Sequence, residues 1–90
     1  MIEVCTYVTE KSPVAGSAKG QSGWFRLSHA MAYVDHPYHS PYEHTLNLDF
    51  LNDAEGPSAR VAVELTPASA RELVRCIEAA LAAAGPAAAG

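Results

Sequence analysis

The sequence is poor in basic residues, in cysteines and in long apolar runs, and each shortage excludes a class of function. Six Lys and Arg residues stand singly among ten Asp and Glu residues, which gives a net charge of −4. Because a phosphate backbone is bound by clustered basic side chains, we expect no nucleic-acid partner. No apolar stretch approaches the roughly 20 residues that a membrane span requires, so we expect no membrane partner.

The N-terminal residues and the two cysteines favour a cytoplasmic location. Residues 1–5 contain no basic region followed by an apolar run, so no signal peptide is expected. Cys5 and Cys76 lie far apart and lack CxxC spacing. In a cytosolic chain this pattern predicts two reduced, packed thiols.

The length of the chain limits it to one domain. With 90 residues, of which 49% are hydrophobic and 18% charged, it is expected to be globular. We predict a single α+β domain over residues 1–85 and a disordered tail over residues 86–90. A chain this short hides only about 60% of its unfolded surface on folding, and many such domains gain stability by self-association. A homodimer is therefore expected.

Four segments alternate between apolar and polar residues, which predicts strands. They cover residues 2–9, 24–34, 44–51 and 60–65. After them, Thr66 is a good N-cap, Pro67 suits a first helical position, and Gly85 ends the run. We therefore predict a four-stranded antiparallel β-meander with one C-terminal helix packed on one face. The apolar stripe of that helix comprises Leu73, Ile77, Ala80, Leu81 and Ala84, with Ala70 and Val74 beside it.

Two strand registers follow from matching apolar positions. Pairing Val34 with Glu43, and Phe50 with Val61, places the large apolar residues on one common face. The other face then holds small or mildly polar residues, which would permit a second sheet to stack closely in a dimer. These residues are Ser28, Ala30, Ala32, Thr45, Asn47 and Ala62.

Residues 35–44 concentrate the chemistry of the chain. They hold three of the four histidines, two carboxylates, two tyrosines and two prolines. Each proline restrains the residue before it to extended geometry, so His36 and His39 would point to one side. Imidazoles commonly bind Zn, Fe, Cu and Ni, and a nearby carboxylate supplies an oxygen or orients a ring. We predict a transition-metal site, with Zn as the first choice and Fe, Cu or Ni as alternatives. Its candidate ligands are His36, His39, His44 and Asp35.

Two other interpretations of this segment stay open. In a metal-free site for a small organic metabolite, Glu43 and Tyr38 would be the catalytic acid and base. Tyr33, Tyr42 and Lys19 would then be the ligand-binding side chains. In the third interpretation the tyrosines and prolines pack the segment against a second subunit. The sequence leaves open whether the protein is an enzyme.

Three nearby features are expected to lie outside the site. His29 is predicted to be a core histidine bonded to a backbone carbonyl, because it lies far along the strand from His44. Asp49 alternates onto the opposite face from His44, so it is not expected to be a ligand. The glycine-rich segment 16–23 lacks the order of a phosphate-binding loop and is expected to be a flexible connection, with a mobile flap as the alternative.

The chain resembles a small, uncharacterised family of short bacterial proteins of about this length, and no settled activity comes with that resemblance. It is carried by Tyr7-Val8-Thr9-Glu10, Gly16-Ser17-Ala18-Lys19-Gly20, Gly23-Trp24-Phe25, Asp35-His36-Pro37, Pro41-Tyr42-Glu43-His44-Thr45-Leu46-Asn47-Leu48-Asp49-Phe50 and Arg60-Val61-Ala62-Val63-Glu64-Leu65.

Overall fold

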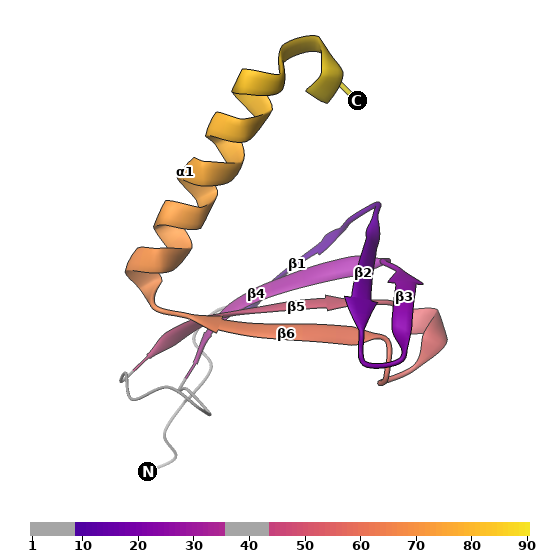
Figure 1. Cartoon of the computed structure of the whole chain (residues 1–90). Helices are drawn as coiled ribbons and strands as arrows, with labels where there is room; N and C mark the ends of the chain where they lie inside the picture. Colours follow the sequence, from indigo (N-terminus) through magenta and orange to yellow (C-terminus); the bar gives the residue numbers. More distant parts are fainter. Residues whose placement is uncertain (1–8, 36–43) are drawn as a thin grey trace.

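The fold is α+β, as predicted: a four-stranded antiparallel sheet, a small second sheet and a C-terminal helix (Figure 1). The computed structural model describes residues 9–35 and 44–90. The larger sheet has the order β1-β4-β5-β6, and the smaller one pairs β2 with β3. The strands are β1 (Thr9–Pro13), β2 (Ser17–Gly20), β3 (Gly23–Arg26), β4 (His29–Asp35), β5 (Thr45–Leu51) and β6 (Arg60–Leu65). The helices are η1 (Asp53–Glu55), α1 (Pro67–Ala84) and η2 (Gly85–Ala88).

The β2–β3 hairpin replaces the flexible connection that we expected over residues 16–23. The strand predicted over residues 24–34 is also interrupted, because β3 ends at Arg26 and β4 begins at His29. Gly23 has a φ of 114°, a conformation that side chains disfavour, and it allows the two-residue turn between β2 and β3. At the base of the hairpin, the Leu27 N–H donates to the Gly16 carbonyl at 2.9 Å. The hairpin is thus an insertion in a four-stranded antiparallel meander. Its first strand, β1, overlaps the strand predicted over residues 2–9 only at Thr9, and the rest of that prediction lies outside the described residues.

One of the two predicted registers is confirmed and the other is wrong. Phe50 pairs with Val61, as predicted. Val34 pairs with Leu46 in place of Glu43, a shift of three residues. Side chains alternate between faces, so an odd shift moves every β4 side chain to the other side relative to β5.

The corrected register separates an apolar face from a polar face. The apolar face comprises Ala30, Ala32, Val34, Leu46, Leu48, Phe50, Val61, Val63 and Leu65. The polar face carries Met31, Tyr33, Asp35, Thr45, Asn47, Asp49, Arg60, Ala62 and Glu64. The small-residue face proposed for dimer stacking therefore does not exist as one surface. Its β4 members lie on the apolar side, whereas its β5 and β6 members lie on the polar side.

The helix begins and ends where the sequence predicts. The Thr66 side chain accepts a hydrogen bond from the Ser69 N–H at 3.1 Å, and Pro67 is the first helical residue. Gly85, with a φ of 58°, ends α1, and η2 follows within the segment expected to be a disordered tail. Among the described residues, none of the helices could cross a membrane, because none is both long and apolar enough.

The helix does not lie over the sheet as expected. It leaves the end of β6 and leans away from the strands (Figure 1). Leu73, Ile77 and Leu81 are 38%, 50% and 55% exposed. Of the hydrophobic residues that the structure describes, Ala59 alone is buried. The described part of the single chain therefore has a folded backbone with very little core.

Candidate functional site

A buried carboxylate organises the polar face of the sheet. Asp49 lies in the middle of β5, and its side chain is only 8% exposed. Tyr33 donates its hydroxyl hydrogen to Asp49 Oδ2 at 3.1 Å, and Arg60 Nη2 donates to Oδ1 at 3.0 Å. Because a buried polar group is costly without partners, these two hydrogen bonds compensate for the burial of the carboxylate.

Strand pairing sets this geometry. Tyr33 pairs with Asn47 and Arg60 pairs with Leu51, so both reach Asp49 from diagonal positions on its own face of the sheet. Directly opposite Asp49 on β6 is Ala62, whose methyl group leaves space above the carboxylate.

A hollow of about 580 Å³ opens over this cluster, and we refer to it as the polar hollow. Its walls carry three carboxylates and one guanidinium, so negative charge is in excess. It is lined by Tyr33, Asp35, Asn47, Asp49, Arg60, Ala62, Val63 and Glu64.

Thr45 supports the polar hollow from below. It is 1% exposed, and its hydroxyl donates to Asn47 Oδ1 at 2.7 Å. With Oδ1 engaged, the amide group of Asn47 keeps its N–H donors for other partners. Thr45 also pairs with Asp35, which holds the rim of the polar hollow next to the end of β4.

The predicted site residues fall into three groups. Tyr33 and Asp35 line the polar hollow, and His44 directly precedes β5 beside it. Lys19 lies on the β2–β3 hairpin, where it pairs with Trp24, and it is not part of the polar hollow. The remaining candidates lie outside the described residues: His36, His39, Tyr38, Tyr42 and Glu43.

His29 lies away from His44, as predicted, but its surroundings differ from a core position. It pairs with Leu51 at the far end of β4. Its Nδ1 atom is 3.0 Å from Ser28 Oγ and 3.1 Å from an Asp53 carboxylate oxygen. The His29 ring is therefore partly exposed and in contact with polar side chains. Asp53 reaches it from η1, the short helix that follows β5 at this edge of the sheet.

The sequence interpretation missed Asp49 and Arg60. It excluded Asp49 as a metal ligand because alternation along the strand puts Asp49 on the opposite face from His44. The same alternation places Asp49 in the polar hollow. The correctly predicted pairing of Phe50 with Val61 already put Arg60 diagonal to Asp49. The available signal was the single charged residue of β5, with an arginine at that diagonal position on β6.

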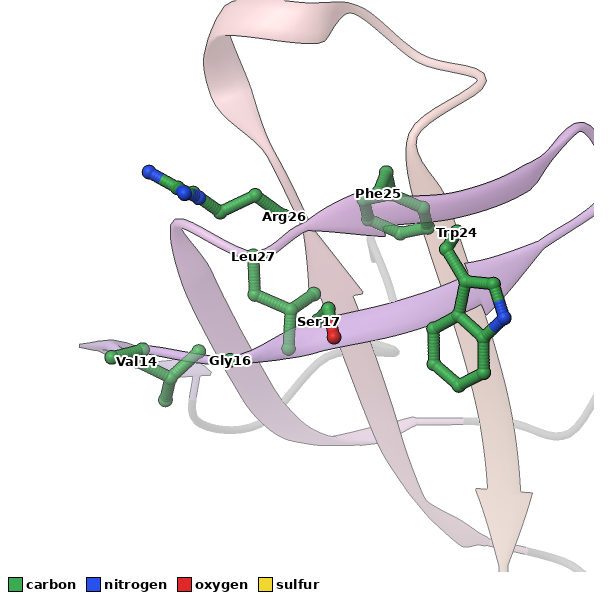
Figure 2. A pocket seen from close by; sticks show the side chains of 8 residues that line it. Val14, Gly16, Ser17, Trp24, Phe25, Arg26 and Leu27 are labelled. Atoms are coloured by element: carbon green, nitrogen blue, oxygen red, sulfur yellow. The ribbon is translucent and has the colours of Figure 1, made fainter.

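A second hollow, of about 680 Å³, is formed where the β2–β3 hairpin joins the chain (Figure 2). Trp24, Phe25 and Leu27 give it a mostly apolar lining, and Figure 2 shows the Arg26 guanidinium pointing away from the Trp24 ring. Its lining carries a single cation and no carboxylate, so it offers less acid–base chemistry than the polar hollow.

No group of three metal-ligating side chains occurs within residues 9–35 and 44–90. His36, His39 and Glu43 lie outside those ranges, so the metal site stays a prediction. Cys76 is exposed rather than packed, and it borders a shallow hollow beside Leu65.

The fold and the polar hollow define a small α+β protein with a charged recess on one face of an antiparallel sheet. The chain belongs to a family of unknown function, DUF6295, whose model matches residues 4–90. This match confirms the resemblance to an uncharacterised family. No curated protein and no solved structure matches the chain.

Proposed function

We propose that the protein binds a small organic molecule carrying an amine in the polar hollow. The observation that carries this proposal is the buried Asp49 carboxylate, held by Tyr33 and Arg60 on the floor of a solvent-open recess. Binding sites typically combine a concave surface with a few fixed polar groups. Here the phenol and the guanidinium are both held in place by the same carboxylate.

The charge of the polar hollow selects the ligand class. Among the described residues, the lining of the polar hollow carries the carboxylates of Asp35, Asp49 and Glu64 and the guanidinium of Arg60, a composition that favours a cationic ligand over an anionic one. The Tyr33 hydroxyl donates to Asp49, and its oxygen can still accept a hydrogen bond from a ligand N–H. An amine placed above Ala62 would thus meet an acceptor and carboxylates together.

A thermal-shift screen of small amines tests this proposal. A ligand present at 100 times its Kd stabilises the folded state by about 2.7 kcal/mol, which for a domain of this size raises Tm by about 10 °C or more. We expect amines, and not matched neutral alcohols or carboxylic acids, to give such a shift. The Glu64→Gln variant should lose most of it.

Glu78→Gln is the matched control, because Glu78 lies on the exposed surface of α1 and away from the polar hollow. It should keep the full shift. A shift equal in Glu64→Gln and in the unmodified protein would show that the amine binds elsewhere, and a screen with no active amine would reject the ligand class.

The second candidate function is binding of a transition metal by the histidine segment. Asp35 pairs with Thr45, so the two ends of residues 36–43 are joined beside His44. A closed connection of that kind lets His36 and His39 meet His44 and Asp35 at a single ion, with Zn as the first choice. This metal would sit at the rim of the polar hollow, on its Asp35 side.

Metal content of protein purified without a histidine tag or chelator tests the second candidate. We expect about one equivalent of metal, and a clear loss in His44→Ala. His29→Ala should retain the metal, because His29 is at the other end of β4. Metal-free protein after supplementation with Zn would contradict this function and leave the amine proposal unaffected.

A further inference from the structure

Beyond Leu73, the apolar stripe of α1 does not pack on the described part of its own sheet. Where the helix starts, Leu65 of β6 lines a shallow hollow together with Ser69, Leu73 and Cys76 of α1. At 100° per residue, Ile77 and Leu81 project about a quarter turn or more from Cys76 and point elsewhere. Both are at least half exposed. The stripe therefore requires a surface that residues 9–35 and 44–90 do not supply in this arrangement.

The second half of the helix is unlike a solvated helix. From Ala79 to Gly90 the sequence contains no charged residue, and all but four of its residues are alanine. A helix that is apolar on all sides is normally buried. Over residues 67–90 every residue is at least partly exposed in the single chain.

The sheet has a matching uncovered surface. On its apolar face the side chains of Leu46, Leu48, Phe50 and Val61 are only half-buried, and Val63 is exposed. The β2–β3 hairpin covers the end of this face near Ala59, whereas α1 rises from the other end (Figure 1). The middle of the face lies between the two.

The surface area of the chain matches what a stable dimer would bury. The chain exposes 6783 Å². A folded monomer of 9.5 kDa exposes about 5000 Å² by the usual scaling with mass, so the whole chain, with residues 1–8 and 36–43 included, exposes about 1700 Å² more. Obligate homodimers bury about 1000–2500 Å² per subunit. The radius of gyration is 15.0 Å, against about 12 Å for a compact domain of this length.

We propose that two copies of the chain form a dimer in which α1 of each copy packs on the apolar face of the other. Both surfaces come from the same chain, so a two-fold axis satisfies both pairs at once. In this dimer, Ile77 and Leu81 of one copy pack against Leu48 and Val63 of the other copy, and together they form a hydrophobic core. Apart from Val63, the residues that line the polar hollow lie on the other face of the sheet, so this proposal does not depend on the proposed ligand.

The mass of the full chain in solution tests the dimer. By light scattering we expect twice 9.5 kDa for the unmodified protein. Ile77→Glu places a charge in the stripe and should shift the protein to monomer at micromolar concentration. Ala68→Glu adds the same charge on the opposite side of the helix and should remain a dimer. A monomeric unmodified protein, or a dimeric Ile77→Glu variant, overturns the proposal.

A cross-linking experiment covers the case in which Ile77→Glu does not fold. With Cys5 and Cys76 replaced by serine, cysteines are introduced at Val63 and Ile77 and joined with a flexible bismaleimide. Exchange of helices predicts a linked species of twice the chain mass. A linked species of single-chain mass would show that α1 folds onto its own sheet, and it would overturn the exchange. Placing the second cysteine at Ala68 should abolish the linked dimer.

Discussion

Asp49→Ala is expected to cost about 3 kcal/mol of stability, because a hydrogen bond to a charged group contributes about 1.5–3 kcal/mol and this carboxylate accepts two. The lower end of that range applies, since the Arg60 side chain is half-exposed and can be hydrated when its partner is removed. In urea denaturation the midpoint should fall, and Tm should drop by more than about 10 °C.

Asp53→Ala is the matched control for this prediction. Asp53 is half-exposed, and one of its carboxylate oxygens lies 3.4 Å from Lys11 Nζ and 3.1 Å from His29 Nδ1. Surface pairs of this kind contribute about 0–1 kcal/mol each, so the control should unfold near the unmodified protein. If both variants lose the same small amount, Asp49 does not organise the polar face. Asp49→Asn, which keeps an acceptor oxygen but not the charge, should fall between the two.

Gly56→Ala is expected to cost about 1–3 kcal/mol through the backbone alone. Gly56 has φ 86° and ψ −176°, a region that essentially only glycine adopts, in the turn between η1 and β6. A Cβ atom added there would meet no atom within 4 Å, so no steric clash contributes. Equilibrium unfolding in urea measures the loss.

Gly90→Ala controls for the general effect of exchanging glycine for alanine. A Cβ atom at Gly90 also meets nothing within 4 Å, and its φ is not in the left-handed region. We expect no measurable change there. Equal stability of Gly56→Ala and the unmodified protein would mean that the turn can adopt another conformation at no cost.

Local sequence signals predicted most of the elements but not the face on which each side chain lies. The Thr66 cap, Pro67 and Gly85 act within one turn of helix, and they were read correctly from neighbouring residues. The register of β4 on β5 was missed by three residues because it depends on how much of the intervening segment is used by the connection. Apolar patterns of similar quality exist in both registers, so the pattern could not decide between them.

The residues of the candidate site also divide into those that the local sequence indicated and those that only strand pairing brings together. Tyr33 and Asp35 were selected for being close in sequence to the histidines, and they do line the polar hollow. Asp49 and Arg60 come from β5 and β6 and are eleven positions apart, so only strand pairing brings them together.

The sequence by itself determined the α+β class, the antiparallel sheet and the capped C-terminal helix, and it marked residues 35–44 as a chemically rich segment. These features depend on periodicity and capping, which are local properties of the chain. Only the tertiary structure decided that the β2–β3 hairpin is inserted, that α1 stands off its own sheet, and that Asp49 closes the floor of the polar hollow. Each of these depends on contacts between residues distant in sequence, where register and packing free energy decide the result and local propensity does not.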